Sequence, residues 1–230
     1  MSTVETHIWP HVFIQQAQLR ERMTIMASPA QRSTNEEALE QIRIEALSCQ
    51  ACPLWKDATQ TVFGEGPAPA PLMLVGEQPG DKEDLAGLPF VGPAGQVLNQ
   101  GLNEAGLDRQ TVYVTNAVKH FKFLQRGKLR LHQKPVTPEI RACRPWFERE
   151  LKLVRPQLVV AMGATAAQSL FGKAMPIGRN RGRVLETYDG TRALITVHPS
   201  YLLRIPEPDR KEEEYRMFVA DLRLAQKTIA

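Results

Sequence analysis

The chain has 230 residues, 43% of them apolar and 23% charged, which is the composition of a globular protein and excludes a wholly disordered or collagen-like chain. Its net charge of +4 permits a polyanionic partner without requiring one. No apolar run approaches the roughly 18 residues of a membrane span, and the N-terminus lacks the apolar core of a secretory signal. We therefore expect a cytoplasmic protein with no membrane segment.

Three cysteines are present, and two of them form the pair Cys49-x-x-Cys52. An odd number with this spacing favours a metal or redox site over a disulfide framework. Metal sites usually take four ligands, so a site that uses all three thiols needs one ligand of another kind.

The predicted elements begin after residues 1–33, which we interpret as an N-terminal extension because no core periodicity joins them to the rest of the chain. A weak helical pattern covers 12–26 within it. Thr34 and Glu37 have the spacing of a capping box and predict that a helix begins there, opening a domain over 34–230.

Short apolar runs alternate with helical patterns along this domain. The predicted strands are 72–75, 112–115, 158–162 and 193–197, and the predicted helices that follow them are 93–105, 137–154, 164–170 and 211–227. Such alternation predicts an α/β fold of three layers (α/β/α) around a central four-stranded parallel sheet.

Polar residues or a glycine follow each predicted strand: Glu77, Asn116, Gly163 and His198. Ligands of open parallel sheets bind beyond the carboxyl ends of the strands. The sequence therefore predicts that one carboxylate, one amide and one imidazole share a crevice.

A basic stretch over 119–134 separates the second strand from the next helix. Its members are Lys119, Lys122, Arg126, Lys128, Arg130 and Lys134, interleaved with Phe121 and Phe123. This composition predicts a phosphate-contacting surface, and a solvated loop without a partner is the alternative.

Four blocks, in this order and spacing, resemble the uracil-DNA glycosylase superfamily, and within it the iron–sulfur branch around family 4. They are Gly-Glu-Gln-Pro-Gly-Asp at 76–81, Pro-Phe-Val-Gly-Pro-Ala-Gly at 89–95, Thr-Asn-Ala-Val-Lys at 115–119 and His-Pro-Ser at 198–200. The resemblance covers roughly residues 36–228.

Two departures from family 4 resemble UdgX-type proteins, in which a loop histidine becomes covalently attached to the deoxyribose C1′ of uracil-DNA. Gln78 stands where family 4 has alanine or glycine, and an extended basic loop over 127–135 contains His132. Leu129 and Leu131 differ from the usual Lys-Arg-Arg-Ile-His of that subgroup.

The resemblance implies roles for individual residues of the pocket. Asn116 would pair with the uracil edge, Phe90 would stack on the base, and His198 would stabilise the negative charge on departing uracil. His132 would capture C1′ with Glu77 orienting its ring or accepting its proton. Gln78, through its backbone, and Asp81 would complete the pocket.

The resemblance also implies a DNA surface and a cluster. Lys128, Arg130 and Arg204 would contact the DNA backbone, and Leu202 or Leu203 would enter the base stack as a wedge. In family 4, four cysteines hold a [4Fe–4S] cluster, and the corresponding residues here are Cys49, Cys52, His120 and Cys143.

His120 thus stands where the family has cysteine, and histidine can replace a thiolate at an iron–sulfur centre, as in Rieske proteins. Spacing alone favours zinc, whereas the resemblance favours the cluster. A surface His120 beside a three-thiolate site is the remaining alternative.

These observations leave three hypotheses of function. The chain excises uracil once and stays bonded to the sugar through His132, or it is a multiple-turnover glycosylase of base excision repair, or it is a non-catalytic nucleic-acid-binding module stabilised by its metal. We expect a monomer whose partner is uracil-containing DNA, with single strands preferred because an exposed uracil costs less to extrude.

Overall fold

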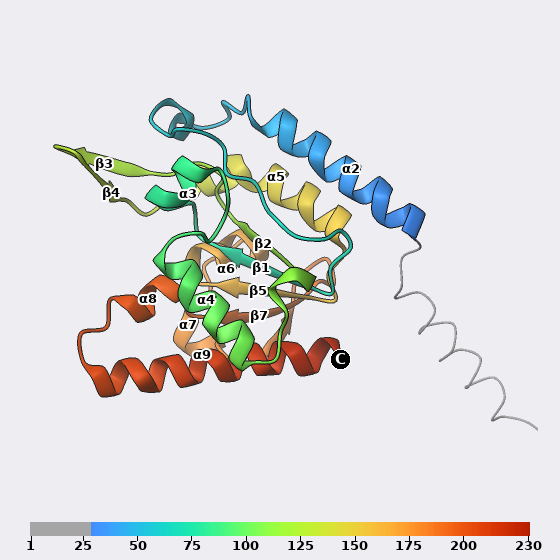
Figure 1. Ribbon diagram of the computed structural model, residues 1–230, viewed down its shortest axis with the longest axis vertical. Coiled ribbons are helices and arrows are strands. Elements are labelled where there is room, and N and C mark those ends of the chain that lie inside the picture. The colour runs from blue at the N-terminus through green and yellow to red at the C-terminus, as the bar shows by residue number, and fades with distance from the viewer. Residues whose placement is uncertain (1–28) are drawn as a thin grey trace, which may run out of the picture.

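The computed structural model describes residues 29–230, which form a five-stranded sheet with helices on both faces (Figure 1). The strand order is β2-β1-β5-β7-β6. The strands are β1 (Leu72–Gly76), β2 (Val112–Asn116), β5 (Leu158–Met162), β6 (Val184–Glu186) and β7 (Arg192–Thr196). The four predicted strands and their parallel pairing are confirmed, within the predicted α/β fold.

The edge strand β6 was not predicted. It pairs antiparallel with β7, so the sheet is mixed rather than purely parallel. Its three residues are exposed or half-buried, so they do not form the continuous apolar run by which the other strands are recognised.

One face of the sheet is covered by α2 (Pro29–Ala46), α5 (Thr137–Val154) and α6 (Ala164–Phe171). On β1, Met73 and Val75 point into this layer, and Leu72 and Leu74 point into the other, as the two-residue period of a strand requires. All four side chains are fully buried.

The opposite face is covered by α4 (Pro93–Glu104), α8 (Pro199–Leu203) and α9 (Pro208–Ile229), of which α9 lies along the bottom of Figure 1. Short elements connect the layers: η1 (Pro53–Lys56), α3 (Asp81–Ala86), η2 (Arg109–Thr111) and α7 (Ile177–Asn180). No helix within residues 29–230 combines the length and apolar character needed to cross a bilayer.

The first described helix begins at Pro29, not at Thr34, so the predicted capping box is wrong. Proline suits the first turn of a helix, and the helix runs through the boundary that we placed after residue 33. The weak helical pattern over 12–26 lies outside the described residues.

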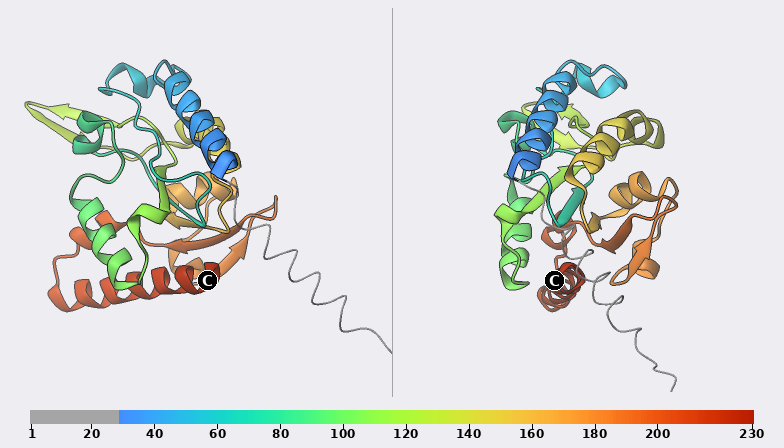
Figure 2. Two further views of the ribbon diagram at one scale, coloured as in Figure 1. Left: turned by 45° about the vertical axis from the view of Figure 1, so that its right-hand side comes forward. Right: turned by 90° about the vertical axis from the view of Figure 1, so that its right-hand side faces the viewer.

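The basic stretch forms a hairpin of β3 (Phe123–Arg126) and β4 (Leu129–His132), which extends away from the body of the molecule (Figure 2). Its two-residue turn is Gly127-Lys128. The hairpin is mostly exposed, so no alternation of buried residues indicated it, and we predicted only a loop.

Candidate active site

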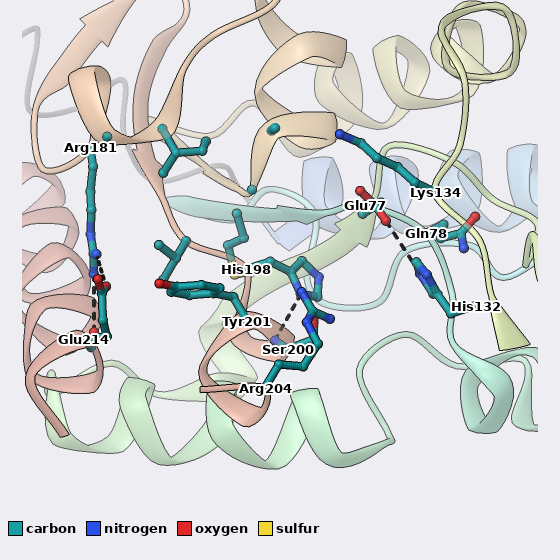
Figure 3. A pocket seen from close by; sticks show the side chains of 16 residues that line it. Glu77, Gln78, His132, Lys134, Arg181, His198, Ser200, Tyr201, Arg204 and Glu214 are labelled. Carbon is teal, nitrogen blue, oxygen red and sulfur yellow. Dashed lines mark hydrogen bonds and ion pairs between the residues drawn. The ribbon is translucent and has the colours of Figure 1, made fainter. Parts of the chain in front are cut away.

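The predicted carboxylate and imidazole share a cavity at the carboxyl ends of β1, β5 and β7, whereas Asn116 is not among the residues that line it. A cavity of about 640 Å³ opens there, and Glu77, Gly163 and His198 all line it together with His132 from β4 (Figure 3). Asn116 is paired in register with Gly76, the residue before Glu77. The strand ends thus bring together residues that lie far apart in the chain.

His132 and Glu77 face one another at this cavity. The Nε2 atom of His132 lies 3.5 Å from Oε1 of Glu77. Burial and the nearby Arg204 lower the pKa of His132 below 6.5, and Glu77 partly opposes them. The imidazole is therefore neutral near pH 7, and a neutral imidazole has the lone pair that a nucleophile needs.

His198 is fully buried, and burial lowers its pKa to about 4. The backbone N–H of Ser200 donates to its Nδ1 at 3.1 Å, so the proton of the neutral ring is on Nε2. Nε2 has no partner among the described residues. It is therefore an N–H donor that no described protein group uses.

Asn116 supplies a second buried group without a partner among the described residues, its Oδ1. A Cβ atom on Gly76 would lie 2.3 Å from this oxygen and 2.6 Å from the ring of Phe90. Only glycine at position 76 therefore leaves room for both the Asn116 amide and the Phe90 ring. The Phe90 ring stacks 5.9 Å from that of His198.

Phe90 holds a backbone φ of 59°, which a non-glycine residue rarely adopts. Such strain is found at ligand sites that the surrounding structure fixes. The acceptor Oδ1, the donor Nε2 and the aromatic face together are complementary to a planar base with N–H and C=O groups at its edge.

The side chain of Gln78 fastens the hairpin to β1. Its Nε2 donates to the carbonyls of Lys122 at 3.1 Å and Gln133 at 3.0 Å, and its Oε1 accepts from the Lys122 N–H at 3.1 Å. We predicted a backbone role in the pocket. The structure adds a side chain that holds both ends of the hairpin containing His132.

Arg130 does not lie free on the surface, as a DNA contact requires. Its guanidinium pairs with Asp81 and with the fully buried Asp84, and its side chain is 15% exposed. Asp81 does not line the cavity and is exposed on α3. Both predicted roles stay predictions, and in this structure the pair ties the hairpin to α3.

The remaining DNA-contact candidates differ in exposure. Lys128 is exposed in the hairpin turn, and Arg204 lines the cavity and donates to Ser200 Oγ at 3.2 Å. Leu203 is 42% exposed, whereas Leu202, on the buried face of α8, is 1% exposed and belongs to the hydrophobic core. Leu202 is thus not available as a wedge, because it packs inside the protein.

Two further members of the predicted phosphate surface are buried. Phe121 and Lys119 are each 1% exposed. The ammonium of Lys119 pairs with Glu150 at 2.5 Å and donates to the carbonyl of Asn116 at 2.8 Å. A buried cation needs such partners, and the hydrogen bond from Lys119 to the carbonyl of Asn116 helps to fix the backbone of Asn116.

The thiols of Cys49, Cys52 and Cys143 are free. Cys52 and Cys143 belong to one small apolar cluster, and burial raises the pKa of Cys143 to about 12. N–H groups point at two of the sulfurs: Trp146 Nε1 at 3.1 Å from Cys49 Sγ, and the Lys119 N–H at 3.1 Å from Cys143 Sγ.

The fourth predicted ligand, His120, is buried, and its Nε2 lies 3.1 Å from Thr61 Oγ1. Within residues 29–230 no three His, Cys, Asp or Glu side chains gather closely enough for a single metal ion. The N–H donors at two of the three sulfurs nevertheless fit the surroundings of thiolate sulfurs in an iron–sulfur site.

Two residues of the site were not predicted: Tyr201, which lines the cavity, and Thr165, which donates a hydrogen bond to Glu77. Lys134, which we predicted only as part of the phosphate-contacting stretch, also lines the cavity. Thr165 is the second residue after Gly163 at the end of β5. The rule that ligands lie beyond strand ends would have found it, had the first turn of the following helix been included.

A family model described as the uracil DNA glycosylase superfamily matches residues 63–223. The Type-4 uracil-DNA glycosylase of Thermotoga maritima is 35% identical over 197 residues, covering 85% of this chain and 97% of that protein. That of Saccharolobus solfataricus is 38% identical, covering 77% and 83%, and that of Archaeoglobus fulgidus is 35% identical, covering 78% and 88%. The chain belongs to the uracil-DNA glycosylase superfamily.

Proposed function

We propose that this protein excises uracil from DNA and that His132 then captures the sugar. The excision is supported by family membership and by the identity to Type-4 enzymes. The capture is supported by one observation above all: a neutral, half-exposed imidazole lies 3.5 Å from the Glu77 carboxylate at the mouth of the cavity.

In this proposal the extruded uracil lies between Asn116 and His198 with its face on Phe90. Oδ1 of Asn116 accepts from N3–H, and Nε2–H of His198 donates to O2. Both groups are buried and lack partners among the described residues. When the C1′–N1 bond breaks, its electron pair leaves with uracil, and the His198 donor stabilises the charge that develops on O2.

The sugar left behind is oxocarbenium-like, and the Glu77 carboxylate stabilises it. One nitrogen of His132 gives its lone pair to C1′, and the proton on the other nitrogen passes to Glu77. The products are uracil anion, which takes a proton from solvent, and an N-alkylated imidazole. Such an imidazole is a poor leaving group, so each protein molecule reacts once.

The second candidate is a multiple-turnover glycosylase, in which water rather than His132 captures C1′. The identity of 35% and 38% to two Type-4 enzymes over most of their length favours it. Counting uracil released per protein molecule distinguishes the two: one equivalent supports capture, and many equivalents select the turnover enzyme. A non-catalytic binding module would release none.

We further propose that Cys49, Cys52, Cys143 and His120 hold a [4Fe–4S] cluster, with zinc as the alternative. The cluster would tie the segment after α2 to α5, a structural role, since glycosidic cleavage moves no electrons. Visible absorption together with iron and sulfide analysis tests this: a colourless protein that contains zinc would overturn the cluster.

Single-stranded uracil-DNA is the proposed substrate, because an unpaired uracil is extruded without loss of a base pair. Excision from single strands should then exceed that from duplexes of the same sequence. We also propose a cytoplasmic monomer, and sedimentation with and without DNA tests its oligomeric state.

A further inference from the structure

Thr165 is a buried hydroxyl that contacts the active-site carboxylate from the side opposite to His132. Its Oγ1 donates a hydrogen bond to Oε2 of Glu77, while Oε1 of Glu77 faces His132. Thr165 is 1% exposed, so water does not compete for this bond. The two oxygens of the carboxylate therefore have different partners.

The position of Thr165 in its helix explains why the hydroxyl is available. Threonine hydroxyls inside helices often donate to the carbonyl one turn earlier. Thr165 is the second residue of α6 (Ala164–Phe171), so no helical turn precedes it. Its hydroxyl is left to donate outside the helix, and it donates to Glu77.

The backbone on both sides of this contact is fixed. The carbonyl of Glu77 accepts from the Val118 N–H at 3.0 Å. Gly163, which starts the turn into α6, has a φ of 93°, and a Cβ there would lie 3.2 Å from His198. Threonine is also stiff about χ1 because it is β-branched. With the backbone fixed, the Glu77 side chain can still rotate about its own bonds, and the hydrogen bond from Thr165 restrains this rotation.

We propose that Thr165 is a positioning residue for the reaction: it holds the Glu77 carboxylate so that Oε1 points at His132 and at the sugar. This inference rests on the proposed function only in giving Glu77 a part in breaking the bond or capturing C1′. It applies equally if water replaces His132 as the nucleophile.

The test is Thr165→Val, which keeps the shape and removes the hydroxyl. The readout is the single-turnover rate of uracil release, with protein in excess over uracil-containing single-stranded DNA. A hydrogen bond to a charged group is lost, so we expect the rate to fall about 10- to 100-fold. Affinity for DNA containing 2′-fluoro-2′-deoxyuridine, a slowly cleaved analogue, should stay the same, because Thr165 does not touch the base pocket.

Two variants separate positioning from packing. Thr165→Ser keeps the donor and should restore most of the rate. Ser169→Ala removes another buried hydroxyl from the same helix, one without a partner among the described residues, and should react like the parent. If Thr165→Val does not fold, Thr165→Ala deletes the same donor with less bulk.

The inference is overturned if the variants lacking the hydroxyl keep the parental rate, if Thr165→Ser is as slow as they are, or if Ser169→Ala is equally slow. Failure of the proposed capture has a different signature: the parent protein then turns over and forms no adduct. The rate of uracil release still reports on Thr165 in that case, so the two failures are distinguishable.

Discussion

His132 lies 3.5 Å from Glu77, although one residue ends a protruding hairpin and the other follows strand β1 of the main sheet. In the proposed reaction, this pair acts on the sugar after uracil leaves. The hairpin is fastened beside it through Gln78, and Thr165 contacts the carboxylate from its other side.

Replacing Glu77 by Gln should slow adduct formation by about 100-fold or more, since a positioned acid–base group contributes that much or more to a reaction. The amide neither stabilises a cationic sugar nor accepts the imidazole proton. Rapid-quench single-turnover assays check this. An adduct rate equal to that of the parent would remove Glu77 from the mechanism.

Adduct formation should decrease as the pH falls, because protonation removes the lone pair of His132. The pKa of His132 is lowered, so the decrease should begin below pH 6.5. His198, with a pKa of about 4, stays neutral over most of this range. A single-turnover rate profile from about pH 8 to about pH 4.5 checks the sign. A rate that rises on acidification would contradict a neutral nucleophile.

The free energy of unfolding should also decrease as the pH falls, because of His198. Its folded pKa lies below the unfolded value of 6.5, so the unfolded chain binds more protons between about pH 4 and 6.5. The stabilisation is complete above pH 6.5 and is lost as the pH falls towards 4. Urea unfolding of the parent and of His198→Asn should therefore give a shallower pH dependence for the variant.

Replacing Gln78 by Ala should loosen the hairpin and slow the capture step more than uracil release. Three hydrogen bonds are lost, two of them to carbonyls that the hairpin presents to β1. We expect adduct yield to fall about tenfold, given roughly 1 kcal/mol net for each such bond and partial replacement by water. Quantifying uracil and adduct in the same quenched samples checks whether the two steps separate.

Leu202 and Leu203 should respond in opposite ways to alanine. Leu202→Ala empties a core position and should cost about 2–5 kcal/mol of unfolding free energy. Leu203→Ala should leave stability unchanged and reduce excision from duplex DNA, if the exposed leucine is the wedge. Thermal unfolding and duplex assays on both variants check this contrast.

Much of the fold is predictable from patterns in the sequence, because four strands are short, predominantly apolar runs and their ends are marked by Glu77, Asn116, Gly163 and His198. The edge strand β6 and the hairpin were not predictable in this way, since neither buries a continuous face. The start of α2 was misplaced because the spacing of Thr34 and Glu37 imitates a cap inside a helix that begins at Pro29.

Site residues could be predicted where a suitable residue type follows a strand end. They could not be predicted where a charged side chain forms an internal ion pair. Arg130, Asp81 and Lys119 are of the types that contact DNA or substrate, yet each has an internal partner of opposite charge. Such pairs join segments distant in sequence, so no local pattern indicates them. Thr165 was missed for another reason: we applied the strand-end rule only to the residue directly after each strand, and Thr165 lies in the first turn of the following helix.

The most direct test of the central claim is denaturing electrophoresis of the protein mixed with labelled single-stranded uracil-DNA, followed by peptide mass spectrometry of the product. We predict an SDS-resistant adduct with the sugar on His132, and no adduct with His132→Ser. Free uracil with no adduct, or an undiminished adduct in His132→Ser, would contradict capture by this histidine.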